Sequence, residues 1–110
     1  MTTIENWNVF FRYSRTHDKV MPYLRGQVYG HPAPYNLDGE VLETTAIEIL
    51  SEDGSVVTTT SGTEYILGMA YGPFIDDVRV KAPRLTESWD LCSLTPAILE
   101  VIEPNVEQSG

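Results

Sequence analysis

The segment from residue 38 to residue 68 constrains the fold most, because it alternates apolar and polar residues between short turns. It reads DGEVLETTAIEILSEDGSVVTTTSGTEYILG. A period of two residues is typical of a β-strand with one buried face, and Asp-Gly and Ser-Gly are typical of tight turns. We therefore predict three consecutive strands, at residues 41–50, 55–60 and 63–68.

The alternation also predicts which side chains of these strands face the core. Ile47 and Ile49 are expected to share one face, with Glu48 on the other. Tyr65 and Leu67 are expected to share a face in the same way. The outward positions then carry mainly Glu and Thr, which gives the strands an acidic, hydroxyl-rich surface.

Two further strands are expected near the N-terminus. Residues 7–14 alternate aromatic and β-branched residues with other side chains, and residues 20–30 follow a polar turn. Pro22 cannot donate to a β-ladder and is expected at an edge or at the start of its strand. Residues 31–39 contain two prolines, Asn36 and an Asp-Gly pair, and are predicted to form a stiff loop that holds Tyr35 near its tip.

The C-terminal part is less regular. Residues 78–81 are compatible with a final strand. Residues 95–104 predict a short helix, because Thr95 can cap it and Pro96 suits the first helical position. The fold class expected for residues 1–110 is a single, mainly β domain. We expect a small, partly open barrel or strongly bent antiparallel sheet of five or six strands with one short C-terminal helix. The alternative is an α+β fold in which residues 86–103 form a longer helical segment.

Composition places the chain among compact globular proteins. Its 110 residues suit one domain, and 42% hydrophobic and 21% charged residues are ordinary values. No apolar run is long enough to cross a bilayer, and the N-terminus lacks the pattern of a signal peptide. The single cysteine, Cys92, cannot form an internal disulfide. Together these features favour a reducing, cytoplasmic location.

The net charge of −9 is unevenly distributed along the chain. Residues 1–25 carry four basic and two acidic residues, whereas residues 26–78 carry nine acidic residues and no basic one. Such an acidic segment repels nucleic acid and anionic membranes, so direct binding to either is not expected. It attracts a basic protein surface. The alternative is that the charge serves only solubility.

No residue pattern predicts catalysis, a metal site or a cofactor. His17, His31 and Cys92 are too few for the usual metal-ligand spacing, and no basic neighbour activates the thiol. We therefore expect a chain that is not an enzyme. The alternatives left open are a small hydrolase or transferase with an unrecognised site, and a structural or assembly protein.

The residues predicted to bind a partner are the acids of the strand region and one loop tyrosine. Tyrosines in Pro- and Gly-containing loops, here Tyr35 and Tyr71, are suited to act as exposed anchors. The predicted partner-binding residues are Tyr35, Glu43, Glu48, Glu52, Asp53 and Glu64.

Residues 24–68 resemble a pattern met in small bacterial and phage-associated proteins of uncharacterised function. The matching parts are RGQVYGHP, a later DG before a strand that ends in Thr, and TTSGTEYILG. The resemblance implies a compact β module and carries over no catalytic residue. We expect a non-catalytic protein-binding module that competes for a basic, nucleic-acid-binding protein surface. An inhibitor from a phage or mobile element, such as an anti-CRISPR protein, fits this description.

Overall fold

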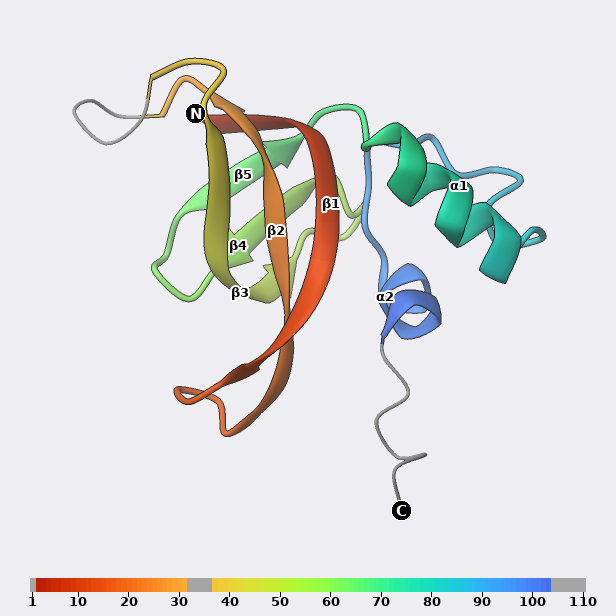
Figure 1. Ribbon diagram of the computed structural model, residues 1–110, viewed down its shortest axis with the longest axis horizontal. Helices are drawn as coiled ribbons and strands as arrows, with labels where there is room; N and C mark the ends of the chain where they lie inside the picture. The colour runs from red at the N-terminus through yellow and green to blue at the C-terminus, as the bar shows by residue number, and fades with distance from the viewer. Residues whose placement is uncertain (1, 32–36, 104–110) are drawn as a thin grey trace.

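Five β-strands form a closed barrel in the computed structural model, which describes residues 2–31 and 37–103. In chain order around the barrel they are β1 (Thr2–Ser14), β2 (Lys19–Tyr29), β3 (Val41–Leu50), β4 (Val56–Thr59) and β5 (Glu64–Leu67). Two helices, α1 (Gly72–Lys81) and α2 (Pro96–Ile102), lie together to one side of the barrel (Figure 1). The predicted mainly β chain of about five strands with a short C-terminal helix is confirmed, and the ring of strands is closed.

A parallel pairing between the first and last strands closes the ring. The start of β1 pairs in parallel with β5, whereas all other neighbouring strands are antiparallel. The pairing continues beyond β5. The Asn6 N–H donates to the Met69 carbonyl at 2.9 Å, and the Tyr71 N–H donates to the Trp7 carbonyl at 2.8 Å. The linker between β5 and α1 is therefore fixed along β1.

The inward-facing side chains of the strands build the core. Trp7, Leu24, Val28 and Val57 are completely buried. Burial of a side chain such as Leu or Val stabilises the fold by about 1.5–3 kcal/mol relative to leaving it exposed. The indole N–H of Trp7 donates to the Gly68 carbonyl at 2.7 Å, so the one polar atom of this ring has a partner.

The inward positions of β5 follow the prediction, but those of β3 do so only in part. Tyr65 and Leu67 are each 4% exposed and belong to the core. Ile47 is also 4% exposed, whereas Ile49 is 60% exposed, so the prediction that they share a buried face is wrong. The pairing of β3 with β4 shifts register between these two residues. One extra residue in a strand turns the following side chains to the opposite face.

The segment predicted as a final strand is helical. Residues 78–81 form the last part of α1, which begins at Gly72 and has Pro73 in its first turn. Its buried residues are Phe74, Ile75 and Val78, a spacing that places them on one face of a helix. That spacing, rather than the local alternation at the end of the segment, decides the structure.

The predicted C-terminal helix is present, and the longer alternative is not. α2 covers only residues 96–102 of the segment 86–103. Thr95 acts as the N-cap, with its hydroxyl accepting the Ile98 N–H at 3.3 Å. No helix in the described ranges is long and apolar enough to span a membrane.

Candidate functional site

Two of the five predicted acids lie against an arginine or histidine side chain of the same chain. Glu43 on β3 accepts a hydrogen bond from Arg25 at 3.0 Å and lies 3.6 Å from Arg12. Glu48 lies 2.8 Å from the ring nitrogen Nε2 of His17, in the turn between β1 and β2. The closed barrel brings the basic N-terminal hairpin against β3, so the charge of Glu43 is balanced by Arg12 and Arg25, whereas Glu48 lies against the imidazole ring of His17.

The other three predicted acids differ among themselves. Asp53 organises the turn between β3 and β4, where its carboxylate accepts hydrogen bonds from the Ser55 N–H and from the hydroxyls of Ser55 and Ser51. These hydrogen bonds lower the pKa of Asp53, with the Ser55 N–H as the largest cause. Glu52 and Glu64 are exposed and form no ion pair with any residue in 2–31 or 37–103.

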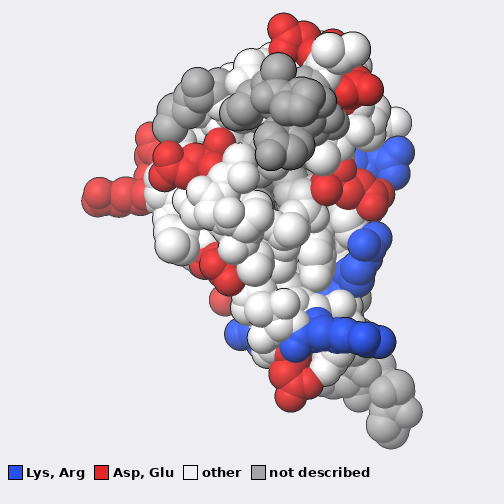
Figure 2. All heavy atoms as spheres, turned by 90° about the vertical axis from the view of Figure 1, so that its left-hand side faces the viewer, with Lys and Arg blue, Asp and Glu red and all other residues white. Residues whose placement is uncertain are grey.

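The acidic residues therefore do not form one continuous acidic face, because basic side chains lie beside some of them. Figure 2 shows acidic side chains on the left and top of the view, and Lys and Arg along its right-hand and lower edges with further acidic side chains next to them. Tyr35, the predicted anchor, lies outside the described residues. The exposed acids Glu52 and Glu64 are the ones still free to meet a partner.

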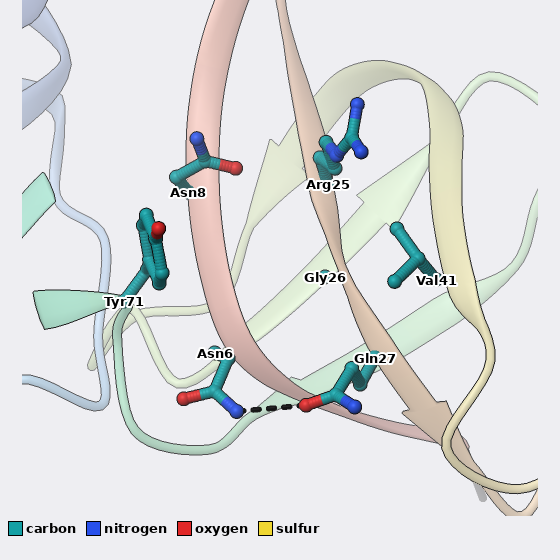
Figure 3. Close-up of a pocket in the computed structure, with 7 residues that line it drawn as sticks. All are labelled: Asn6, Asn8, Arg25, Gly26, Gln27, Val41 and Tyr71. Carbon is teal, nitrogen blue, oxygen red and sulfur yellow. Dashed lines mark hydrogen bonds between the residues drawn. The ribbon is translucent and has the colours of Figure 1, made fainter. Parts of the chain in front are cut away.

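A groove crosses the outer surface of β1 and β2 beside the start of α1. Its volume is about 620 Å³. It is lined by Asn6, Asn8, Arg25, Gly26, Gln27, Val41 and Tyr71. Figure 3 shows Asn8 and Tyr71 on one side of this groove, Arg25 and Val41 on the other, and Gly26 between them.

An irregularity in β1 creates the groove. The pairing of β1 with β2 shifts register between Glu5 and Asn8, and Asn6 within it has a φ of 50°. Asn tolerates this left-handed conformation better than most residues. The Asn6 side-chain amide donates to the Gln27 side-chain oxygen at 2.7 Å across the groove (Figure 3). The bulge thus turns Trp7 inward and presents amide groups outward.

Gly26 allows the two strands to approach each other at the bulge. A Cβ atom at this position would lie 2.8 Å from the Glu5 carbonyl oxygen, 2.8 Å from a side-chain carbon of Ile4 and 3.0 Å from the Trp7 Cα. These distances are shorter than van der Waals contacts. Only glycine therefore fits here without movement of β1.

Tyr71 and Asn8 are two groove residues whose side chains are available to a ligand. Tyr71 is 45% exposed and precedes α1, and its side chain makes no capping hydrogen bond. The Asn8 side chain makes no hydrogen bond with any residue that the structure describes. Both side chains can therefore contact a partner without losing an interaction within the chain.

Next to the groove, two aromatic rings and an arginine form a stacked group on the same face of the hairpin. The rings of Phe10 and Tyr23 stack with centroids 5.5 Å apart. The Arg12 guanidinium lies over both rings, 4.9 Å from the Phe10 centroid and 5.5 Å from that of Tyr23. The Arg12 side chain is 57% exposed, and a cation over an aromatic face at such a site is stabilised by about 0.5–1 kcal/mol.

The structure gives His17 partners that the sequence did not indicate. Its Nδ1 atom lies 2.8 Å from the Ser14 hydroxyl, and its Nε2 atom lies 2.8 Å from Glu48. Serine hydrolases arrange a serine nucleophile, a histidine base and a carboxylate in the same hydrogen-bonded order as Ser14, His17 and Glu48. However, Ser14 is only 6% exposed and lines neither the groove nor a second hollow of about 340 Å³ beside His31.

Cys92 lies in the segment between the two helices and is partly exposed. Burial raises the pKa of the Cys92 thiol, and the negative charges of Asp90 and Glu5 raise it further. A raised pKa disfavours the nucleophilic thiolate. Across residues 2–31 and 37–103, no three His, Cys, Asp or Glu side chains are grouped so as to hold a metal ion.

Comparison with known proteins assigns the chain to no family. No family model matches the sequence, no curated protein matches it, and no solved structure matches it.

Proposed function

We propose that the chain is a non-catalytic protein-binding module that acts in the cytoplasm on a partner with a basic surface. The observation that carries this proposal is the groove on the outer face of β1 and β2, where Tyr71 is exposed, Asn8 is half-buried, and neither side chain is hydrogen-bonded within the described chain. Tyrosine combines a large apolar area with a polar tip and is enriched among residues that dominate binding energy.

The chemistry of the groove suits an extended segment of a protein partner. The amide side chains of Asn6, Asn8 and Gln27 offer both donors and acceptors, which a peptide backbone can use in either direction. Tyr71 offers a flat apolar surface to a side chain of that segment. We therefore place the anchor at Tyr71, since the other predicted anchor, Tyr35, is outside the described residues.

The net charge of −9 supports a basic partner. Exposed carboxylates chiefly raise the rate of association with an oppositely charged surface, and their effect fades with salt. Glu52 and Glu64 are expected to contribute most, because Glu43 and Glu48 already face Arg12, Arg25 and His17. If the basic surface normally holds phosphates, the module acts as an inhibitor that competes with nucleic acid.

The test begins with affinity capture from the native host, followed by binding kinetics with the purified partner. Replacement of Tyr71 by Ala is expected to weaken binding by about 2 kcal/mol, or about 30-fold in Kd, mainly through faster dissociation. Replacement of Val80, which is 82% exposed on α1, by Ala is the matched control and leaves binding unchanged. If both variants bind as tightly as the original, the groove is not the contact surface.

The acids are tested in two pairs at low and high salt. The Glu52→Gln, Glu64→Gln variant is expected to associate more slowly at low salt and at the original rate at high salt. The Glu43→Gln, Glu48→Gln variant is expected to change the rate less, because Arg12 and Arg25 already face Glu43 and the His17 ring covers part of Glu48. Equal effects of the two pairs would contradict the assignment. Addition of an oligonucleotide to the partner tests the competition directly.

The hydrogen-bonded series Ser14, His17 and Glu48 favours a second candidate, a small hydrolase. In that case Ser14→Ala and His17→Ala would abolish the biological effect of folded protein, and an ester substrate or fluorophosphonate probe would react with Ser14. A binding module predicts no reaction. It also keeps its effect when His17, His31 and Cys92 are all replaced by Ala, and it acts at about one copy per target site.

A further inference from the structure

The hairpin tip and the outer side of β3 lie next to each other on one face of the molecule. The tip, residues 13–19, extends beyond the barrel at the end of the β1–β2 hairpin (Figure 1). The contact of 2.8 Å between His17 and Glu48 holds this tip against β3. Two surfaces of different chemistry are therefore adjacent at this point.

The tip combines an exposed aromatic ring with free positive charge. Tyr13 is 55% exposed, and its hydroxyl donates to Asp18. Arg15 and Lys19 are exposed, and neither forms an ion pair with any residue in the described ranges. The tip thus offers an apolar ring and two unpaired cations to a partner.

The neighbouring surface has the opposite character. Ile49, which follows Glu48, is 60% exposed. Thr58 on β4 lies opposite Ile49 on one side and opposite Glu64 on the other, so these three side chains form a row across three strands. Glu52 is exposed in the turn that follows β3. We call Ile49, Glu52, Thr58 and Glu64 the apolar–acidic patch.

We propose that two copies of the chain form a two-fold symmetric dimer, in which the tip of each copy docks on the apolar–acidic patch of the other. Tyr13 then covers Ile49, and Arg15 and Lys19 approach Glu52 and Glu64. The charges and the exposed apolar side chains of the two surfaces are complementary, and both surfaces belong to one face. A two-fold axis through that face satisfies both contacts at once and closes the assembly at two copies.

This inference shares Glu52 and Glu64 with the proposed function, but it concerns the chain alone, and the groove variant Tyr71→Ala separates the two proposals. The groove with Tyr71 belongs to a different set of residues, so a dimer leaves it open to a partner. Failure of dimerisation would leave the expected effect of Tyr71→Ala on partner binding intact, and failure of the groove variants would leave the dimer unaffected. Because Glu52 and Glu64 serve both proposals, their variants are tested for partner binding at concentrations where the chain is monomeric.

Sedimentation equilibrium of the purified full chain tests the dimer. We expect twice the monomer mass at low salt and a shift toward monomer at 1 M salt, where charges are screened over about 3 Å. Two charge-reversal variants are then compared, Arg15→Glu with Lys19→Glu, and Glu52→Lys with Glu64→Lys. When either variant is the only chain present, like charges face each other in both contacts of the dimer. We therefore expect the dimer dissociation constant to rise at least about 100-fold.

A one-to-one mixture of these two variants is the decisive sample. In a two-fold dimer of the mixed pair, each reversed tip meets a reversed patch and each original tip meets an original patch, so dimerisation returns. Arg79→Glu with Arg84→Glu, which reverses two exposed charges elsewhere, is the matched control and keeps the dimer. Circular dichroism confirms that every variant is folded.

Three results would overturn the proposal: an original chain that stays monomeric at low salt and high concentration, reversed variants that still dimerise alone, or a mixture that stays monomeric. Assemblies larger than two would exclude the two-fold arrangement. The Ile49→Ser variant tests the apolar part separately and is expected to weaken the dimer at both salt concentrations.

Discussion

Replacement of Gly26 by Ala tests the close approach of β1 and β2 at the bulge. The added Cβ would lie 2.8 Å from the Glu5 carbonyl oxygen and from a side-chain carbon of Ile4. Ile4 is completely buried, and the backbone around the bulge is fixed by hydrogen bonds to the linker before α1. Neither neighbour can move freely. Overpacking of this kind typically costs about 1–3 kcal/mol, so we expect the free energy of unfolding to fall by that amount.

Urea unfolding followed by tryptophan fluorescence measures this change, because Trp7 lies beside the bulge. The melting temperature is expected to fall by about 4–8 °C for each kcal/mol lost. Gly72→Ala is the matched control. A Cβ there meets no atom within 4 Å, so we expect no loss and a gain of up to about 1 kcal/mol. If Gly26→Ala is as stable as the original chain, the close approach is not a constraint on the fold.

Three further predictions concern a turn, a thiol and a helix cap. The pKa of Asp53 is lower in the folded protein than in the unfolded chain. Its ionised form therefore stabilises the fold above the unfolded pKa, and this stabilisation is lost as pH falls through the folded pKa. The free energy of unfolding of Asp53→Asn should therefore decrease less than that of the original chain as the pH is lowered. A pKa of Asp53 in the folded protein equal to that of a free side chain, measured by NMR, would refute this. Because its pKa is raised, the Cys92 thiol should react with a disulfide reagent more slowly than free cysteine at neutral pH. Unfolding in urea should remove this difference. Equal rates for the folded protein and free cysteine would contradict the prediction. Thr95→Ala should cost about 1 kcal/mol in urea unfolding, whereas Thr95→Ser, which keeps a capping hydroxyl, should cost less.

Local patterns in the sequence predict much of the barrel but not its bulges. The strand expected at residues 41–50 has those bounds in the structure, because alternation and flanking turns are local properties. The orientation of Ile49 depends on how β3 aligns with β4, which is decided by packing between strands. The spacing of apolar residues in the sequence does indicate the bulge in β1. The buried residues Ile4 and Trp7 are three positions apart, whereas Trp7 and Val9 are two apart.

The candidate site was less predictable, since its residues come from separate segments. The pairing of Glu43 with Arg12 and Arg25 requires the N-terminal hairpin to lie beside β3, which no local pattern indicates. The groove depends on an irregular backbone at Asn6 and on the linker that ends at Tyr71. Tyr71 could be expected to be exposed from its Gly-Pro neighbours, but its position beside β1 comes from closure of the barrel.

The parallel pairing of β1 with β5 has a consequence for the order of folding. The hairpin of β1 and β2 forms across a four-residue turn, whereas closure joins residues about 60 positions apart. The entropic cost of joining chain ends grows as (3/2)RT ln n, so closure costs about 2 kcal/mol more than the hairpin. We therefore expect the meander of strands to assemble first and the seam to form last. Until the seam forms, β1 and β5 are edge strands with unpaired backbone N–H and C=O groups. The intermediate with these open edges is the species most prone to aggregate.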